Sequence, residues 1–232
     1  MLSISLQLRS KIAPGSDNPG ERARPPGGYY AGAVPGPAEL RELSRPDFLA
    51  SLETLLAVYT AAMQPDRAHL GGRLSIMERH AGYPGFRAIV AVPPGAPAGP
   101  PPPAVLAFAY GFRGAGGQWW HDVVATAITA SAGAGTASGW LADSMEIAEV
   151  HVRPEHQHQG TGRRLMHALT AGRGERTAVL STQDSNSPAR SLYRSLGFTD
   201  LLRGFSFPGG GPPYAVMGAA LPLRGRPAPA AR

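Results

Sequence analysis

The sequence contains no cysteine, a single lysine and no long apolar run, and each scarcity excludes a class of protein. Without cysteine, a disulfide framework, a thiolate nucleophile and a cysteine-based zinc site are impossible. No apolar run reaches the length of about 20 residues that a membrane-spanning helix needs. The opening segment, MLSISLQLRSKIAPG, lacks the apolar core and cleavage signature of a secretory signal. We therefore expect a cytoplasmic protein without a membrane partner.

Positive charge comes almost entirely from arginine, because Lys11 is the only lysine in a chain of formal net charge +6. A charge of this sign is compatible with nucleic-acid binding. The arginines are scattered, however, and no basic run reaches five residues, which is more typical of a solvated arginine-rich surface. We expect no nucleic-acid partner and keep a nucleic-acid-binding protein as a third hypothesis.

Glycine and proline are abundant, with 30 and 24 occurrences in 232 residues, and they gather outside the periodic segments. Residues 1–37 are Pro/Gly-rich and are expected to be a largely disordered extension, although residues 2–9 alternate like a strand. Residues 38–222 are expected to form one domain, and residues 223–232 a disordered tail.

Hydrophobic periodicity predicts an α+β domain with a strand–helix–strand–helix unit at its centre. The predicted strands are 38–43, 86–92, 104–112, 144–152, 177–182, 201–207 and 214–221. The predicted helices are 44–63, 68–81, 118–129, 162–171 and 187–196. Ser44 is expected to cap the first helix, and residues 131–139 are expected to be a flexible linker.

The stretch EVHVRPEHQHQGTGRRL, residues 149–165, joins a predicted strand to a predicted helix through glycines and histidines. Unpaired amides at a helix N-terminus attract anions. Gly160 and Gly162 permit a phosphate to approach the backbone, and Arg163 adds charge. A Rossmann fingerprint needs glycine or alanine where Leu165 stands, and a P-loop needs a lysine that is absent here.

Two further patterns identify the phosphate loop. QHQGTG, residues 157–162, reads Gln-x-x-Gly-x-Gly, and NSPARSLYRSLGF, residues 186–198, reads Asn-x-x-Ala-x-x-x-Tyr-x-x-x-Gly-Phe. In this order, separated by one helix and one strand, they resemble the acetyl-CoA loop and fourth-helix motif of the GNAT superfamily of N-acetyltransferases. The resemblance covers about residues 38–222. The chain departs from the family pattern at His158, where glycine is usual, and at Thr161, where an aliphatic residue is usual.

The resemblance implies a GNAT fold, in which a mixed, mostly antiparallel central sheet is flanked by helices. It also implies acetyl-CoA as co-substrate and direct acetyl transfer to a primary amine of a small-molecule or protein acceptor. The alternative is a non-catalytic acyl-CoA-binding or regulatory module, because fold does not guarantee chemistry. Such a protein can be a monomer or a homodimer.

The resemblance also assigns cofactor-binding positions. They are Val150, His151, Val152, Gln157, His158, Gln159, Gly160, Thr161, Gly162, Arg163, Asn186 and Tyr193. The backbone of residues 150–152 is expected to hydrogen-bond the pantetheine arm where the flanking strands splay. The amide after Val150 is expected to polarise the thioester carbonyl. Asn186 is expected either to cap its helix or to meet the cofactor.

Three side chains are candidates for proton transfer. Tyr193 is the candidate acid by its motif position, with a purely structural core tyrosine as the alternative. Glu146 and Glu149 are candidate bases on one strand. Because they are three residues apart, we expect them on opposite faces, with Glu146 on the face of Val150 and Val152 and Glu149 on that of His151. The sequence does not choose between them.

Two clusters are ambiguous. Trp119, Trp120 and His121, in the stretch QWWHD, form either an acceptor-pocket wall or packing on the sheet edge. The histidines at positions 151, 156 and 158, with Glu155, lie close together in sequence. Zinc needs three or four convergent ligands, and we expect no metal here.

Overall fold

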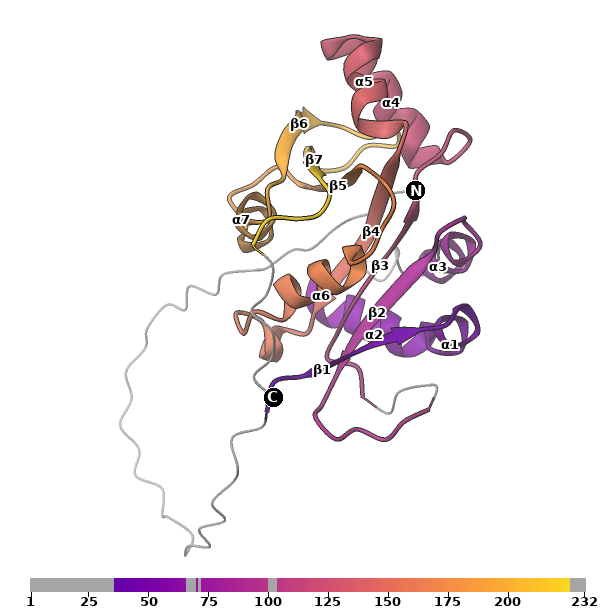
Figure 1. The fold of residues 1–232 in the computed structure, drawn as a ribbon, viewed down its shortest axis with the longest axis vertical. Coiled ribbons are helices and arrows are strands. Elements are labelled where there is room, and N and C mark those ends of the chain that lie inside the picture. Colours follow the sequence, from indigo (N-terminus) through magenta and orange to yellow (C-terminus); the bar gives the residue numbers. More distant parts are fainter. Residues whose placement is uncertain (1–35, 66–69, 71, 100–103, 226–232) are drawn as a thin grey trace, which may run out of the picture.

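The computed structural model describes residues 36–65, 70, 72–99 and 104–225. The strand alternative at residues 2–9 and most of the expected terminal extensions therefore lie outside the described residues. The described chain is built around one twisted sheet (Figure 1). Its strands are β1 (Glu39–Leu43), β2 (Arg87–Val92), β3 (Ala107–Arg113), β4 (Ser144–Val152), β5 (Thr177–Gln183), β6 (Thr199–Phe205) and β7 (Tyr214–Ala220).

The sheet order is β1-β2-β3-β4-β5-β7-β6, and only β4 and β5 run parallel to each other. Every other neighbouring pair is antiparallel. This confirms the predicted α+β class and the mixed, mostly antiparallel sheet. The segment AELREL provides the edge strand β1, as one of the two sequence alternatives predicted.

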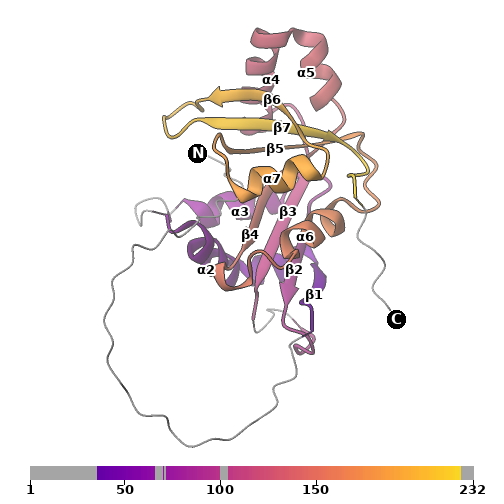
Figure 2. The same ribbon diagram turned by 90° about the vertical axis from the view of Figure 1, so that its left-hand side faces the viewer.

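Seven α-helices flank the sheet within the described residues. They are α1 (Arg45–Ala50), α2 (Leu52–Met63), α3 (Arg73–Ala81), α4 (Trp119–Ala132), α5 (Ala134–Leu141), α6 (Thr161–Thr170) and α7 (Pro188–Ser195). Helices α6 and α7 pack on one face, in a core that contains Leu165 and Ala189. Figure 2 shows them together on one side of the sheet.

The other face is covered in two halves. Helices α1–α3 pack over β2 and β3 through a core that contains Phe108 and Phe112, and α4 and α5 pack over β5 and β7 through one that contains Val179. Directly opposite residues of neighbouring strands share a face. Glu146 is opposite both Phe112 and Val179, so α3 and α4 lie over the same face, on either side of Glu146.

The predicted helix over residues 44–63 is interrupted once. Ser44 caps it as expected, because its Oγ accepts from the Asp47 amide at 3.3 Å. At Ser51, however, the hydroxyl donates to the Asp47 carbonyl at 2.7 Å, and the Ser51 amide bonds to Phe48 instead. A serine side chain that competes for the i−4 carbonyl disturbs a helix, which divides the segment into α1 and α2.

The expectation of a flexible linker at residues 131–139 was wrong. Gly133 turns the chain with φ of 84°, and α5 begins at the next residue. Ala137 and Leu141 of α5 are buried in the core that α4 and α5 share with β5 and β7. Tertiary burial of an apolar face stabilises short helices beyond their intrinsic propensity, so the glycines and serines of this stretch did not prevent helix formation.

None of the helices in the described residues combines the length and apolar character required to cross a lipid bilayer.

Candidate active site

The segment between β4 and α6 places backbone amides at a helix N-terminus. A short 3-10 helix, Pro154–His156, follows β4, and Gly160 precedes α6 in a left-handed conformation with φ of 76°. The first four amides of an α-helix have no acceptor within the helix, and the helix dipole is positive at that end. The loop therefore has a geometry suited to an anion.

His158 keeps the backbone shape that glycine usually provides in this loop. Its φ is 60°, in the left-handed region, and histidine is among the non-glycine residues found there more often than most. The His158 side chain is exposed. The other departure, Thr161, is the buried first residue of α6 and keeps its amide donor.

A surface cavity, here named the loop cavity, lies between this loop and the start of α7. It is lined by Val152, His156, Gln157, His158, Gly160, Thr161, Gly162, Arg163, Pro188 and Leu192. The lining contains an arginine and no carboxylate. The guanidinium of Arg163 also donates to Ser195 Oγ at 2.6 Å, which ties α6 to α7. This positive, amide-rich lining fits the diphosphate group of a cofactor such as acetyl-CoA.

Strands β4 and β5 separate next to this cavity. They pair only over residues 144–146 and 177–179. Beyond this point, within the described residues, the β5-facing edge of β4 at Val150–Val152 has no strand partner, while the other edge pairs with β3. An extended ligand arm can hydrogen-bond to such an edge as an added strand does.

Asn186 precedes α7 but does not cap it. The cap is Ser187, whose Oγ accepts from the Arg190 amide at 3.2 Å. Asn186 itself is exposed. The expectation that Asn186 caps the helix was wrong, because α7 starts one residue later in the chain. Its other expected role, contact with the cofactor, stays a prediction.

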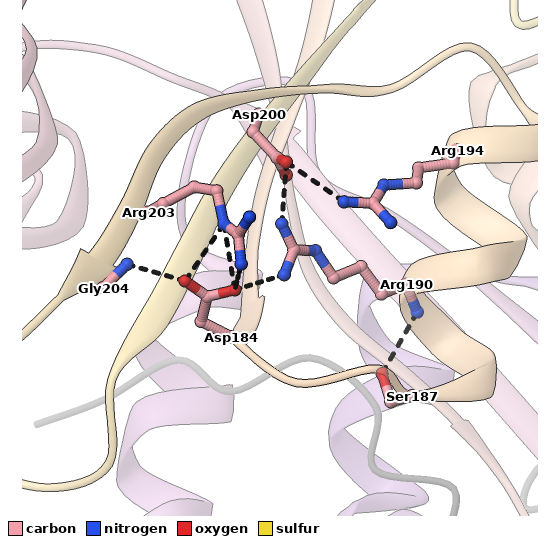
Figure 3. Close-up of polar contacts among 7 residues, drawn as sticks. All are labelled: Asp184, Ser187, Arg190, Arg194, Asp200, Arg203 and Gly204. Atoms are coloured by element: carbon pink, nitrogen blue, oxygen red, sulfur yellow. Dashed lines mark hydrogen bonds and ion pairs between the residues drawn. The ribbon is translucent and has the colours of Figure 1, made fainter.

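The segment that carries Asn186 is held by an ion network (Figure 3). The buried Arg190 side chain of α7 pairs with Asp184 and, at 2.7 Å, with Asp200 of β6. Asp184 also accepts from the Gly204 amide at 2.7 Å and from Arg203 at 2.9 Å. Both ends of the β5–α7 connection are therefore fixed to the β6 strand.

Tyr193 lies in the core between α6, α7 and the sheet. Its side chain is fully buried, and its ring centroid is 5.8 Å from that of Phe198. Ala189, Tyr193 and Leu196 share the buried face of the helix, as predicted. Tyr193 does not line the loop cavity, so the role of candidate acid stays a prediction beside the alternative of a structural tyrosine.

The predicted separation of Glu146 and Glu149 onto opposite faces was wrong. The pairing of β3 with β4 contains a β-bulge, in which Tyr110 is opposite Glu149 while Gly111 is opposite Ile147. Ala148 is the extra residue, and such an insertion shifts the alternation of side chains by one position. The two glutamates therefore share one face of the sheet.

The same bulge assigns the neighbouring residues of β4 to the two faces. Glu146, Glu149 and His151 pair with Phe112, Tyr110 and Phe108, which lie under α1–α3. Val150 and Val152 belong to the core under α6 and α7 instead. Glu146 therefore does not share a face with the two valines, whereas Glu149 and His151 do share one as expected.

Glu149 is committed to a buried ion network. Its Oε1 accepts from Arg73 of α3 at 2.6 Å, and its Oε2 contacts His151 Nε2. Arg73 also donates to the Tyr59 hydroxyl at 2.8 Å. Burial favours the neutral carboxyl, but Arg73 and His151 outweigh it, so the pKa of Glu149 is lowered.

Glu146 is equally buried but has no compensating cation. Only 2% of the residue is exposed, and its Oε2 has no hydrogen-bond partner among the described residues. Burial raises the pKa of Glu146 to about 8. A carboxyl whose pKa lies near neutrality suits a general base.

Glu146 lines a second cavity, here named the α3–α4 cavity, with a volume of about 280 Å³. The other lining residues are Ile76, Arg79, His80, Tyr83, Phe112, Gln118, Trp119 and Trp120. The loop cavity lies toward α6 and α7, whereas this one lies on the opposite face of β4. Glu146 is the last β4 residue that pairs with β5, so its carboxylate stands where the two strands separate.

The structure divides the roles of the QWWHD stretch. Trp120 is buried and its indole donates to Ser181 Oγ at 3.1 Å, whereas Trp119 is 38% exposed. Both tryptophans line the α3–α4 cavity, and His121 does not. Asp122 accepts from the Gly117 amide at 3.0 Å. Trp120 therefore both packs in the core and forms part of the cavity wall, as the two alternatives proposed. The role of His121 in binding the acceptor stays a prediction.

Sequence reasoning missed the α3 side of the site, namely Arg73, Arg79 and His80. One signal was present, since Arg73 lies four residues before the buried Met77. Residues at this spacing share a helix face. An arginine on the inward face of a helix requires a buried acid, and Glu149 on β4 is that acid.

The three clustered histidines do not converge. His151 lies on β4 under α2, with its ring centroid 5.1 Å from that of Tyr59, whereas His156 and His158 are residues of the loop cavity. Within residues 36–65, 70, 72–99 and 104–225, no group of three or more histidine, aspartate or glutamate side chains is arranged to hold a metal ion.

Comparison with known proteins finds similarity to one family of enzymes. The sequence profile of the acetyltransferase (GNAT) domain matches residues 118–200, which include α4, β4, the loop and α7. A GCN5-like protein acetyltransferase of Mycobacterium tuberculosis is 41% identical over 123 residues. This match covers 51% of the present chain and 60% of that relative's length.

Solved structures show the same fold. An aminoglycoside 6'-acetyltransferase type Ii is 16% identical over 78% of this chain and 96% of its own, with a TM-score of 0.52. A putative acetyltransferase from Salmonella typhimurium, solved with acetyl-CoA, is 21% identical over 84% and 99%, with a TM-score of 0.51. These likenesses show a GNAT-type fold, and the profile match shows a GNAT acetyltransferase domain at residues 118–200.

Proposed function

We propose that the chain is an N-acetyltransferase that transfers an acetyl group from acetyl-CoA directly to a primary amine. The observation that supports this most is the relation of the two cavities. An anion-binding loop lies on one face of β4, and a buried, uncompensated carboxylate lies on the other, at the point where β4 and β5 separate.

The loop cavity is the proposed cofactor site. The amides of residues 157–163 would hold the diphosphate, and the backbone of Val150–Val152 would hold the pantetheine arm. The exposed Asn186 adds a polar group at the start of α7. Bound acetyl-CoA supplies an acetyl thioester. The acetyl-CoA in the Salmonella typhimurium structure supports this choice of cofactor.

Glu146 is the proposed general base. An ammonium group is not nucleophilic, so the acceptor amine has to lose a proton before and during attack. Glu149 is a poorer candidate, because Arg73 and His151 already occupy both of its oxygens. Glu146 has a free oxygen and lines a cavity that an amine can enter.

Two further groups complete the proton and charge balance. The proposed donor to the carbonyl oxygen, on which negative charge develops, is a backbone amide at the open edge of β4, that of Val150 or Val152. The expected amide after Val150, that of His151, points toward β3 instead. Tyr193 is the proposed acid that protonates the departing thiolate. The amine nitrogen then holds the acetyl group, Glu146 holds the amine proton, and the thiol leaves with the proton from Tyr193.

The acceptor can be a small molecule or a protein. The M. tuberculosis relative is called a protein acetyltransferase. This name supports a protein amine as a candidate acceptor beside a small-molecule amine. The non-catalytic alternative shares the loop cavity but needs no base. The base is therefore the feature that separates an enzyme from a binding module.

Two measurements test the proposal together. Acetyl-CoA should raise the melting temperature of the full chain, because a ligand that binds only the folded state stabilises it. Thiol release from acetyl-CoA should depend on an added primary amine. A thermal shift without thiol release for any amine or lysine peptide would indicate the binding module, and the absence of both would contradict the cofactor assignment.

A further inference from the structure

The α3–α4 cavity has three chemical parts in a fixed arrangement. A carboxylate, Glu146, is buried at the sheet. The walls are mostly aromatic and apolar, and an arginine, Arg79, is exposed at the α3 side. In the proposed function, the carboxylate of Glu146 interacts with the reacting amine. The aromatic and apolar walls and Arg79 are therefore the parts that can select the group to which this amine is attached.

The walls fit an apolar stem. The ring centroid of Phe112 is 4.9 Å from that of Tyr83 and 4.8 Å from that of His80. On the opposite side, Trp119 and Trp120 extend from α4. Trp119 is one of two large apolar side chains that are exposed in the described residues. Stacked and edge-on aromatic surfaces favour methylene chains and rings over polyhydroxylated groups.

The charge of the lining is positive at neutral pH. Arg79 forms no ion pair with any of the described residues. Burial lowers the pKa of His80 to about 4, so its imidazole is neutral. Burial raises the pKa of Glu146 to about 8, so this carboxyl is largely protonated at neutral pH. A second positive charge on the acceptor would therefore be repelled by Arg79, and the lining offers no second carboxylate to pair with it.

We propose that the acceptor is a monoamine on an apolar stem that carries a carboxylate, with the amine at Glu146 and the carboxylate at Arg79. This inference rests on the proposed function, because it assigns the acceptor end of the same site. The cavity volume of about 280 Å³ lies just below the range of about 300–1,000 Å³ that is typical of ligand pockets, which suits one short stem. Polyamines and aminoglycosides, which carry several cations, are excluded by the same argument.

A matched amine series tests the charge at the far end. 6-Aminohexanoate, hexylamine and pentane-1,5-diamine share a stem of five methylenes and a primary amine, and they differ in an anionic, neutral or cationic end group. We expect kcat/KM, measured by thiol release, to be about threefold higher for 6-aminohexanoate than for hexylamine and about tenfold higher than for the diamine. The differences should shrink in 0.5 M salt because the exposed Arg79 is screened.

Two variants assign the preference to one residue. Arg79→Gln should abolish the order of the series, and Arg79→Glu should reverse it in favour of the diamine. Arg45→Gln is the control, because Arg45 is an exposed arginine of α1 that lines neither cavity. An unchanged order in Arg79→Gln, or no preference in the wild type, would overturn the inference and leave the proposed function intact.

A binding readout separates the inference from the activity. Trp119 and Trp120 line the cavity, so tryptophan fluorescence should report occupancy without acetyl-CoA. We expect 6-acetamidohexanoate to quench more strongly than N-hexylacetamide in the wild type and equally in Arg79→Gln. If no amine releases thiol but this binding difference holds, the proposed function fails while the selectivity of the cavity stands. Equal binding in the wild type would overturn the selectivity.

An experiment with two peptides identifies whether the acceptor's carboxylate belongs to a protein or to a small molecule. Two peptides present one lysine, flanked by aspartates in one and by asparagines in the other. Faster acetylation of the acidic peptide, lost in Arg79→Gln, would assign the carboxylate to a protein surface. Preference for 6-aminohexanoate with no peptide turnover would assign it to a small amino acid. Faster acetylation of the neutral peptide would count against the proposed role of Arg79.

Discussion

Glu146 and Glu149 show how a single inserted residue can assign two identical side chains to different chemistry. The bulge at Ala148 turns both toward α3, but only Glu149 meets Arg73. One carboxyl is therefore held ionised, while the other retains a proton near neutral pH. At the scale of the residue, neighbouring charge rather than burial distinguishes them, because both are buried.

The pH dependence of activity should follow Glu146. Its carboxyl has to be deprotonated to accept a proton, so kcat/KM should rise with pH and level off above about pH 8. Glu146→Gln should reduce kcat/KM about 10²- to 10⁴-fold and abolish this limb of the profile. Glu149→Gln serves as the comparison. If it removes the limb near pH 8 and Glu146→Gln does not, the base is assigned to the wrong glutamate.

The pH dependence of the free energy of unfolding should also reflect the ionisation of Glu146. Because folding raises the pKa of Glu146 from 4.5 to about 8, its proton stabilises the folded state fully below about pH 4.5. This stabilisation is lost as the pH rises through 8. Glu146→Gln should therefore be the more stable protein at pH 9, by roughly a few kcal/mol, and close to the wild type at pH 5. Urea denaturation at both values measures this, and a difference independent of pH would contradict it.

The Arg73–Glu149 pair should behave as one unit. Arg73→Met leaves a buried carboxylate with one partner fewer, which typically destabilises a protein by about 3–5 kcal/mol. The double variant Arg73→Met with Glu149→Gln should regain part of this loss, because no unpaired charge remains. A double-mutant cycle by chemical denaturation measures the coupling, and additive effects would indicate that the pair is not coupled.

Tyr193 can be tested without changing the core. Tyr193→Phe removes only the hydroxyl, so it should lower kcat much more than it weakens acetyl-CoA affinity. Thiol release and calorimetric titration with CoA measure the two effects. Unchanged kcat would leave Tyr193 as a structural residue of the core between α6 and α7.

At the scale of the element, the β4–α6 loop depends on two left-handed residues in close succession. Gly160 and His158 have φ of 76° and 60°, and both residues line the loop cavity. Gly162 has a different role. A Cβ there would lie 3.2 Å from Leu192 Cδ2, so its glycine permits the close approach of α6 and α7.

Substitutions of Gly160 can test the effect of charge in the loop independently of backbone conformation. A Cβ at this position would meet no atom within 4 Å, so a side chain has space. Gly160→Glu should weaken CoA binding by more than tenfold, since it brings a carboxylate to the anion site. Gly160→Asn is the control, because asparagine tolerates the left-handed region and is neutral. Equal affinities of the two variants in a CoA titration would mean that the loop does not bind the diphosphate.

At the scale of the whole molecule, the ion network around Arg190 connects α7 and the segment before it with the edge strand β6 (Figure 3). Arg190→Met would leave Asp184 and Asp200 with fewer partners, and we expect a loss of about 3 kcal/mol in the free energy of unfolding. We also expect weaker CoA binding, because the segment that carries Asn186 would lose its anchor. Arg194→Met is the control, since this half-exposed arginine makes only one contact of 3.2 Å, with Asp200. Similar losses in both variants would contradict a specific role of the network.

Local patterns were sufficient for most elements of the sheet and for the β4–α6 loop. The strand at residues 144–152, the helix that follows the loop and the stop at Gly197 follow from apolar periodicity and glycine positions, which depend on near neighbours. α5 was not predictable in this way, because its stability comes from burial against β5 and β7, which lie about 40 and about 80 residues later in sequence. The break at Ser51 depended on one side-chain hydrogen bond.

The sequence by itself determined the resemblance to a family, the order of the strands and of most helices, and the position of the β4–α6 loop, because these depend on motifs that are continuous in the chain. Only the tertiary structure decided that Glu149, and not Glu146, is paired with an arginine. That outcome depends on the β-bulge at Ala148 and on an arginine 76 residues away from Glu149. It also depends on the packing of α3 and α4 over the same stretch of β4. Pairing register and long-range charge contacts are properties of the folded chain, and no local pattern encodes them.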